Sequence, residues 1–418
     1  METLQAYLDR KSEEIALLNG LLKSDRPPLK PTSVAESIEE KFRLAAELRA
    51  DAVRRDWALT ETHWTNAGRP HSGPFEFNYD YQRADLQVSG PSFCQLDESL
   101  PVATVYTSAG MGAISALLMA IGRVFSNAEI VVHPESYAET IELVDSFATH
   151  LRRLPGDRSA RRNETSRTPC PRILFLDSCL STSAFEALLG CVETADLLVF
   201  DTTCFSSGSS RIKRVVRRAI RSSSAIVLVR SHTKLDSLGI EYGRLGSATF
   251  ISSENTSREN ALRSILAQTK AAVRLFGSAA VPAHFPPYVA APNYRSLSNR
   301  RGAALLRNGH RASRHLSRTV GREMHFTHGL YVTLRPTKDI DEGGTRQLVE
   351  KMCSDIRRGG LPLHHAGSFG FDFASAEWAR DAVSDQYVVR IAFADLPTAM
   401  SDEICSAIAS WWKMQERR

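Results

Sequence analysis

Five short runs between residues 102 and 231 are apolar at nearly every position. They are VATVYTS (102–108), EIVVH (129–133), RILFLD (172–177), DLLVFD (196–201) and AIVLVRS (225–231). Such runs are typical of strands buried on both faces. Stretches with helical spacing lie between them, near 111–124, 136–151, 183–194 and 211–222. The alternation predicts an α/β fold, in which a mainly parallel sheet forms the middle of three α/β/α layers.

The flanking regions have a different pattern. Residues 1–60 have apolar positions at helical spacing, with a break at Pro27–Pro31. The stretch from Trp57 to Gln95 is polar, aromatic and rich in glycine and proline, and it predicts an extended arm. We therefore expect an N-terminal helical segment and arm over 1–98, followed by the large domain over 99–280.

A smaller domain is predicted over 281–418. The segment VPAHFPPYVAAPNY (281–294) is rich in proline and alanine and reads as a junction. The pattern beyond it predicts a helix near 297–317, strands near 330–335 and 387–393, and a helix near 402–414. This order is that of a C-terminal α+β domain.

Composition narrows the classes of function. The 418 residues include 43% hydrophobic and 24% charged residues, which excludes wholesale disorder. A net charge of +5 is weak and does not argue for a nucleic-acid partner. The run RIKRVVRRAIR (211–221) has apolar residues at helical spacing, so its arginines are expected on a solvated helix face. The seven cysteines lack the paired spacing of a zinc site, and we expect no metal.

The chain also lacks the sequence signs of a membrane or secreted protein. No apolar run approaches the roughly 20 residues that span a bilayer. The amino terminus lacks the charged-then-apolar order of a secretory signal. We therefore expect a cytoplasmic protein without a membrane partner.

Polar residues stand at or just past the ends of the predicted strands: Ser108, His133, Asp177, Asp201 and Ser231. Right-handed crossovers bring the carboxyl ends of parallel strands to one edge of the sheet. Ligands of open α/β sheets bind at that edge. We therefore look for functional residues there.

Lys234 closes the segment SHTK (231–234), directly after a buried strand. The chain has ten lysines and forty-two arginines, so a lysine at this position is informative. A lysine at a strand end, flanked by hydroxyls, suits a Schiff-base amine, because burial lowers its pKa and frees the nucleophilic form. A surface lysine in a loop is the alternative.

Other residues carry a functional and a structural interpretation. Asp201, followed by Thr202 and Thr203, is suited to hold a metal, orient a base or pair with a buried cation, and the structural alternative is a turn or N-cap residue. The segment TSAGMGAI (107–114) suits a helix start that binds phosphate, or an ordinary turn. Tyr137, at the start of a helix, suits stacking on a planar ligand, or packing. Arg390, inside a strand, suits a clamp for a substrate carboxylate, or a salt bridge.

Taken in this order, these residues resemble the pyridoxal-phosphate enzymes of fold type I. The resemblance is greatest to the cysteine/methionine-metabolism family of cystathionine synthases, cystathionine lyases and methionine γ-lyase, and it covers roughly 77–393 as short motifs. It implies an aspartate-aminotransferase-like fold and pyridoxal 5'-phosphate as the cofactor. It also implies active sites shared between the subunits of a homodimer or homotetramer.

The resemblance assigns the cofactor residues by motif. The segment YDYQRADL is similar to the family's Tyr-x-Arg dimer arm, which implies that Tyr81 and Arg83 reach the cofactor phosphate of the neighbouring subunit. TSAGMGAI is similar to Ser-Gly-Met-x-Ala-Ile, which implies that the amides of Gly110 and Met111 bind the phosphate. SYAET resembles Tyr-Gly-Gly-Thr, with Tyr137 stacked on the pyridine ring.

Three later motifs complete the implied site. FDTT resembles Asp-Asn-Thr, with Asp201 on the pyridine nitrogen and Thr203 among the cofactor-binding residues. SHTK matches Ser-x-Thr-Lys, with Lys234 as the Schiff-base lysine and Ser231 and Thr233 near the phosphate. AGSFG and VVRIAFADL are similar to the segments that place a serine and an arginine at the substrate carboxylate, here Ser368 and Arg390.

The chain departs from the family at several places. The segment from Asp177 to Thr182 replaces Glu-Thr-Pro-Ser-Asn-Pro, so the asparagine near the cofactor's ring hydroxyl is missing, and Ser181 or Asp177 is the candidate replacement. Ala109 replaces the serine of Ser-Gly-Met. These departures imply a specialised enzyme that acts on an unusual amino acid.

The function implied is a lyase or transferase that eliminates or replaces a β- or γ-substituent of an α-amino acid. Lys234 would take the Cα proton, and Tyr137 is a candidate acid or base at the leaving group. Transamination, racemisation and decarboxylation are alternatives with the same cofactor. A fold relative without catalysis is the alternative of another class.

Overall fold

The computed structural model describes residues 1–22, 27–56, 71–78, 87–97, 100–155, 170–222, 224–252, 256–321, 324–327, 330–381 and 384–416. The chain forms two compact units, which we name by their place in the sequence. The terminal unit comprises Met1–Asp51, Lys234–Tyr242 and Tyr288–Arg418, and the central unit comprises Ala52–Thr233 and Gly243–Pro287. The ranges 1–98, 99–280 and 281–418 stay a prediction.

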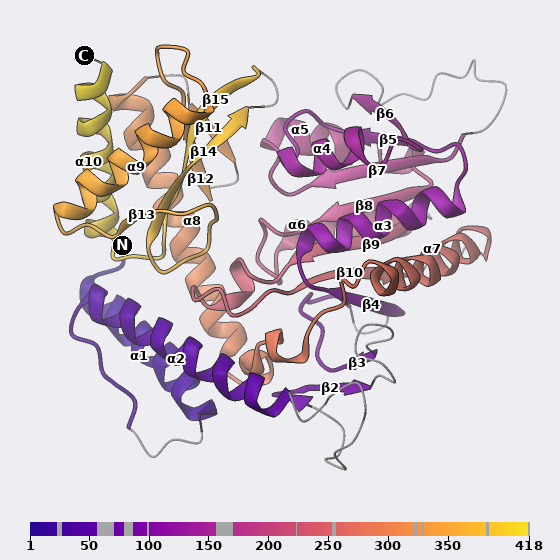
Figure 1. Ribbon diagram of the computed structural model, residues 1–418, viewed down its shortest axis with the longest axis horizontal. Coiled ribbons are helices and arrows are strands. Elements are labelled where there is room, and N and C mark those ends of the chain that lie inside the picture. Colours follow the sequence, from indigo (N-terminus) through magenta and orange to yellow (C-terminus); the bar gives the residue numbers. More distant parts are fainter. Residues whose placement is uncertain are drawn as a thin grey trace. The chain divides into compact units, whose positions relative to one another are not determined.

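The central unit is built on a seven-stranded sheet (Figure 1). Its order is β4 (Val102–Thr107), β10 (Gly246–Ile251), β9 (Ala225–Ser231), β8 (Leu197–Asp201), β7 (Arg172–Asp177), β5 (Glu129–Val132) and β6 (Arg152–Pro155). The strands from β9 to β6 are parallel, whereas β10 runs antiparallel to both β9 and β4. The sheet is therefore mainly parallel, as the sequence predicts.

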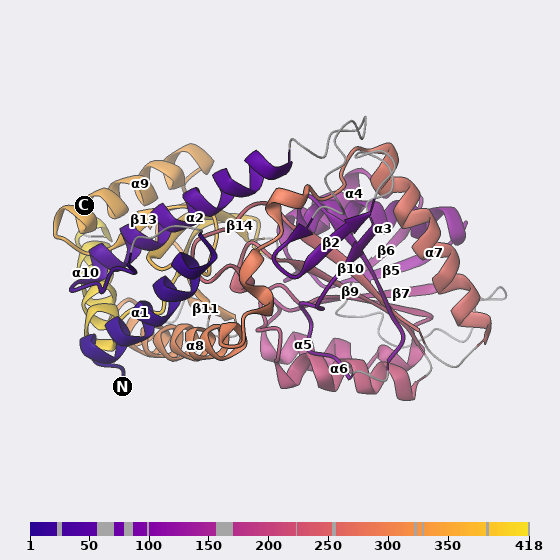
Figure 2. The same cartoon turned by 90° about the horizontal axis from the view of Figure 1, so that it is seen from below.

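Helices cover both faces of this sheet (Figure 2). On one face lie α3 (Gly110–Val124), α4 (Ala138–Ser146) and α7 (Thr256–Leu275), and on the other lie α5 (Thr182–Leu189) and α6 (Ser210–Arg221). Alternate side chains of each strand supply the two cores: Ile173 and Phe175 pack on the α3 side, Leu174 and Leu176 on the α5 side. The three-layer arrangement is confirmed.

The basic run in α6 behaves as an amphipathic helix. Ile212, Val215, Val216 and Ala219 are buried against the sheet. Arg214 and Arg217 are exposed. The apolar spacing, rather than the charge, therefore explains why this segment is helical.

The remaining elements of the central unit are short. The strands β1 (His71–Ser72), β2 (Phe75–Asn78) and β3 (Gln87–Ser89) form a small antiparallel sheet within the predicted arm. Two 3-10 turns are η2 (Val192–Thr194) and η4 (Pro282–His284), and a third, η5 (Pro287–Ala290), crosses into the terminal unit. Tyr81 and Arg83 lie outside the described residues.

The terminal unit has a five-stranded sheet of its own. The order is β11 (Met324–Thr327), β12 (Tyr331–Leu334), β15 (Gln386–Ala392), β14 (Ala374–Asp381) and β13 (Leu363–His365). Its helices are α1 (Leu4–Leu21), α2 (Val34–Asp56), α8 (Tyr294–Thr319), α9 (Glu342–Arg358) and α10 (Thr398–Glu416), with the 3-10 turn η3 (Leu235–Ser237). The helices predicted near the amino terminus are present within residues 1–22 and 27–56, as are the helices and strands predicted beyond residue 294.

The two faces of this second sheet differ in character. Val332, Val389 and Ile391 pack into the apolar core that the helices of the terminal unit share. The residues between them in the pleat, such as Thr333 and Arg390, point to the opposite face. We name this opposite face, which carries Thr333, Glu377 and Arg390, the polar face of the terminal sheet.

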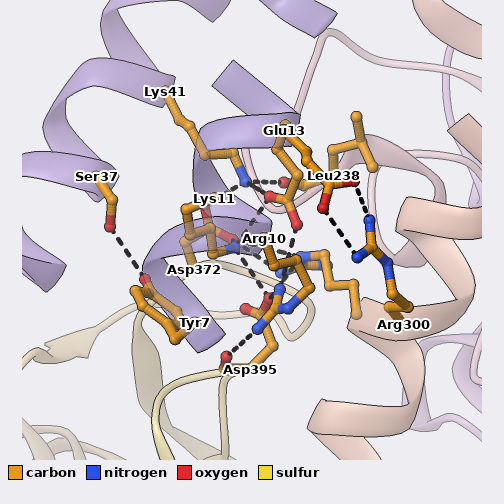
Figure 3. A network of polar contacts seen from close by, with 12 residues as sticks. Tyr7, Arg10, Lys11, Glu13, Ser37, Lys41, Leu238, Arg300, Asp372 and Asp395 are labelled. Atoms are coloured by element: carbon orange, nitrogen blue, oxygen red, sulfur yellow. Dashed lines mark hydrogen bonds and ion pairs between the residues drawn. The ribbon is translucent and has the colours of Figure 1, made fainter. Parts of the chain in front are cut away.

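A buried charge network joins the helices of the terminal unit (Figure 3). Its members are fully or almost fully buried, and they come from α1, α2, α8 and two loops: Arg10, Lys11, Glu14, Lys41, Arg301, Asp372 and Asp395. Lys11 Nζ lies 2.8 Å from Asp372 Oδ1, 2.9 Å from Asp395 Oδ2 and 3.0 Å from Glu14 Oε2. Burial favours the neutral acids, but the surrounding cations hold the pKa of Asp372 and Asp395 below the usual range.

The network also fixes the loop that follows Lys234. Lys41 Nζ donates to the carbonyl oxygen of Leu238 at 2.6 Å and lies 2.5 Å from Asp372 Oδ2. Leu238 has a φ of 50°, a left-handed conformation that costs a leucine about 1 kcal/mol. The next residue, Gly239, has a φ of 88°, and a Cβ there would clash with Asp372 Oδ1. The buried charges therefore hold a backbone segment whose left-handed conformation is itself strained.

Of the helices that the structure describes, none is both long and apolar enough to cross a membrane. Five of the seven cysteines are buried: Cys94, Cys179, Cys204, Cys353 and Cys405.

We predict that Lys41→Met destabilises the protein by about 3–5 kcal/mol, because it leaves the carboxylates of Glu14 and Asp372 buried without this cation. Arg300→Met is the matched control, since Arg300 pairs with Glu13 at the surface and such pairs contribute less than about 1 kcal/mol. Urea-induced unfolding measures both. Equal effects of the two substitutions would contradict the role we give to the buried network.

Candidate active site

A hydrogen-bonded series connects the ends of two neighbouring strands in the central unit. Asp201 ends β8, and its Oδ1 accepts from the backbone N–H of Thr203 at 2.8 Å. Thr203 Oγ1 accepts from the backbone N–H of Ser231, the last residue of β9, at 3.0 Å. The hydroxyls of Ser231 and Thr233 lie 2.9 Å apart. We name Asp201, Thr203, Ser231 and Thr233 the strand-end series.

Two buried carboxylates stand side by side at this sheet edge. Asp177 and Asp201 are register partners at the ends of β7 and β8. Burial, together with the charge of Asp177, raises the pKa of Asp201 to about 7. Burial also raises the pKa of Asp177, although its carboxylate accepts backbone bonds from Tyr137 and Cys179, each at 2.9 Å. The pair therefore favours a bound proton or cation.

The start of α3 packs directly on the strand-end series. A Cβ on Gly110 would lie 2.9 Å from Ser231 Cβ, so only glycine permits this approach. Ala109, the N-cap residue of α3, makes no side-chain hydrogen bond to the helix. A helix start without a side-chain cap presents backbone N–H groups to an anion. Met111 lies in this first turn, and its Sδ is 4.0 Å from Thr140 Oγ1.

Tyr137 is the N-cap residue of α4 and is half-buried. Its backbone N–H donates to Asp177. The carboxylate whose charge raises the pKa of Asp201 therefore also holds the start of this helix. The position of Tyr137 in the central unit thus depends on Asp177.

Lys234 belongs to the terminal unit and is attached to Thr233 by the peptide bond between the two units. It is half-buried, and its Nζ donates to Ser368 Oγ at 2.5 Å. The Nζ also lies 5.9 Å from the ring centre of Phe369. Ser368 is held in turn, because Ser375 Oγ donates to its carbonyl oxygen at 2.7 Å. The structure thus brings Lys234 and Ser368 together.

Arg390 lies on the polar face of the terminal sheet and is paired within the chain. Its Nε donates to Glu377 Oε1 at 2.8 Å, and one terminal nitrogen donates to the same oxygen. The guanidinium also lies 5.0 Å from the ring centre of Tyr331. A salt bridge, one of the two interpretations of Arg390, is therefore present.

Two solved structures are similar to the chain over most of its length. MetB from Corynebacterium glutamicum has a TM-score of 0.50 and 15% identity, and the match covers 75% of this chain and 81% of that protein. Cystathionine γ-synthase from Xanthomonas oryzae pv. oryzae, solved with aminoacrylate and cysteine, also has a TM-score of 0.50 and 15% identity, with 88% and 98% covered. The chain has the cystathionine γ-synthase fold. No protein-family model and no curated sequence matches the chain.

Within this fold, the described residues fit the cofactor that the sequence resemblance implies. A phosphate needs hydrogen-bond donors, and the uncapped start of α3 lies beside the hydroxyls of Ser231 and Thr233. A protonated ring nitrogen needs a buried anion. Burial and the charge of Asp177 destabilise the carboxylate form of Asp201, and a positively charged partner would stabilise it. The donor set and the acceptor set therefore match the two polar ends of pyridoxal phosphate.

Three residues hold candidate residues or the loops beside them in a way that the sequence does not indicate. Arg230 is buried and donates to the carbonyl oxygens of Thr202 and Phe205, which holds the loop after β8. Asp177 positions Tyr137, a role visible only once β7 and α4 are placed. Glu377 pairs with Arg390, and cross-strand register cannot be read from one strand alone.

We predict a pH dependence of stability that Asp201 causes in protein free of cofactor. Its pKa is raised on folding, so the folded state binds the extra proton, and stability falls as the pH rises from about 4 to about 7. Asp201→Asn abolishes this proton uptake. As the pH rises through that window, the free energy of unfolding of the variant should increase relative to that of the wild type, by up to about 1.4 kcal/mol per pH unit.

Unfolding midpoints between pH 5 and pH 8 test this. Asp145→Asn, at an exposed position of α4, is the control and should keep the wild-type slope. A parallel pH dependence in Asp201→Asn and the wild type would show that Asp201 does not take up the proton.

Proposed function

We propose that the protein is a pyridoxal-phosphate-dependent enzyme, a lyase or transferase that acts on an α-amino acid. The reaction proposed is elimination or replacement of a substituent at Cβ or Cγ. The strand-end series carries this proposal, because it runs by hydrogen bonds from a buried acid to the residue before Lys234. An acid, paired hydroxyls and a lysine in this order are what a cofactor with a ring nitrogen, a phosphate and an aldehyde requires.

The phosphate is assigned to groups at the start of α3 and the end of β9. We assign it the backbone N–H groups of Gly110 and Met111 and the hydroxyls of Ser231 and Thr233. The fit of α3 on Ser231 and the absence of a side-chain cap on this helix support the assignment. The arm residues Tyr81 and Arg83, from the neighbouring subunit of a homodimer or homotetramer, would complete the anion site.

The ring is assigned to Asp201, Thr203 and Tyr137. A buried carboxylate whose proton affinity is raised by Asp177 holds a proton on the ring nitrogen more firmly than a solvated one. Thr203 orients that carboxylate through its backbone N–H. Tyr137 would stack on the ring, and Asp177 fixes its backbone.

When bound, pyridoxal phosphate supplies an electron sink for the charge that develops at the substrate Cα. Lys234 would supply the amine that holds the cofactor, and the same amine would move the proton at the substrate Cα. The hydrogen bond to Ser368 holds Lys234 Nζ in place before reaction. Tyr137 is the candidate acid or base for the leaving group.

Ser368 and Arg390 are assigned to the substrate carboxylate. Both lie in the terminal unit, which also contains Lys234, and a guanidinium binds a carboxylate with two parallel hydrogen bonds. Such a clamp would align the Cα–H bond for proton transfer. The cystathionine γ-synthase neighbour was solved with aminoacrylate and cysteine, which directs substrate trials towards β- and γ-substituted amino acids.

We predict that purified protein incubated with pyridoxal phosphate gains a visible absorption band and converts at least one member of an amino-acid panel. Elimination yields a keto acid and ammonia, identified by mass spectrometry and an ammonia assay. Lys234→Arg should lower turnover at least about a thousandfold, because the amine that moves the Cα proton is lost. Lys270→Arg, at an exposed position of α7, is the control and should behave as the wild type.

Other products would indicate a different reaction. Consumption of a keto-acid acceptor without ammonia release indicates transamination, and loss of carbon dioxide indicates decarboxylation. A colourless protein that converts no amino acid would leave a fold relative without catalysis.

A further inference from the structure

The ion pair between Glu377 and Arg390 lies on the polar face of the terminal sheet. The two residues are directly opposite each other in the antiparallel pair β14–β15. Their side chains are 18% and 21% exposed, so the pair is neither sealed in the core nor fully solvated. Solvent and small solutes can therefore reach an arginine that already holds a carboxylate.

The pair is continuous with the surroundings of Lys234 through side chains of the same unit. The Arg390 guanidinium lies over the Tyr331 ring, whose centre is 6.5 Å from that of Phe369. Phe369 lies 5.9 Å from Lys234 Nζ. On the other side, Glu377 Oε2 lies 2.8 Å from the position of a Cβ on Gly367, the residue before Ser368. The glutamate thus reaches the segment that contacts Lys234.

The manner of pairing leaves the glutamate replaceable. The two hydrogen bonds that Arg390 donates to Glu377 go to the same oxygen, Oε1. A ligand carboxylate that binds the guanidinium through two oxygens forms the stronger parallel arrangement. It must, however, displace Glu377 or share the cation with a second negative charge.

We propose that Glu377 is a specificity-determining residue that competes with the carboxylate of the substrate for Arg390. The inference rests on the proposed function, in which Arg390 binds that carboxylate. Glu377 weakens the binding of simple α-amino acids. It lowers the affinity only of ligands that present a carboxylate to Arg390. The protein therefore selects substrates whose remaining contacts compensate for opening the ion pair, which excludes small, common amino acids.

The test compares two probes that differ only in the carboxylate, L-alanine and L-alaninamide, on protein loaded with pyridoxal phosphate. Titration calorimetry gives both dissociation constants. Glu377→Gln keeps the shape and removes the charge, and it should tighten the binding of L-alanine by about two- to fivefold, the range of a partly exposed ion pair. L-Alaninamide should change less than about twofold, because it presents no carboxylate for Arg390.

Matched variants separate competition from a merely structural role. Glu350→Gln, at an exposed position of α9, should leave both constants unchanged. In the double variant Glu377→Gln/Arg390→Met the gain for L-alanine should vanish, because the competed cation is gone. Glu377→Asp, whose shorter side chain keeps the charge, gives the same comparison if the glutamine variant does not fold, and it should tighten L-alanine by less.

Two results would overturn the inference. One is an unchanged or weaker affinity of Glu377→Gln for L-alanine, and the other is an equal gain for the acid and the amide. The absorption band of the bound cofactor, measured in the same samples, separates this failure from failure of the proposed function. A band with no acid-specific gain refutes the role of Glu377, whereas no band in any variant refutes the cofactor assignment itself.

Discussion

The terminal unit depends on the pairing of charges that have almost no contact with water. Arg10, Lys11 and Glu14 come from the first helix, Lys41 from the second, and Asp372 and Asp395 from distant loops. Leaving any one of them unpaired costs several kcal/mol, so the elements that carry them are held together as a set. Because Lys41 also binds the Leu238 carbonyl, the first two helices stabilise the backbone just after Lys234. They are part of the framework of the proposed site rather than an appendage to it.

A second constraint operates at the sheet edge of the central unit. Backbone N–H groups hold two neighbouring carboxylates there, and a close-packed helix start and a pair of hydroxyls lie at the same edge. Their electrostatic demands are opposite, since the acids favour a positive group and the helix start favours an anion. A single ligand with both charges satisfies both demands. In the terminal unit, internal partners hold the groups proposed to act on substrate: Ser368 holds Lys234, and Glu377 holds Arg390.

The sequence predicts the parts of the fold that depend on local apolar pattern. Fully apolar runs mark β7, β8 and β9, and the polar residues at their ends mark the sheet edge. The apolar pattern does not predict strand β10, because Ser247 and Thr249 are polar residues typical of loops and yet are buried in the sheet. The pattern does not predict the charge network for a similar reason. Charged residues of an amphipathic helix, such as Arg10, Lys11 and Glu14, are expected at the solvent-exposed face, and only the tertiary packing shows that they are buried. Pairs across strands, such as Glu377 with Arg390, need a register that no single segment encodes.

The central claim of this account is that one lysine of the ten, Lys234 in the segment that follows β9, carries the cofactor. Borohydride makes a lysine–pyridoxal link permanent, and peptide mapping by mass spectrometry then locates it. The account predicts that protein saturated with pyridoxal phosphate carries the reduced label on the peptide that contains Lys234, at about one per chain. A label confined to other lysines, or no label at all, would contradict it.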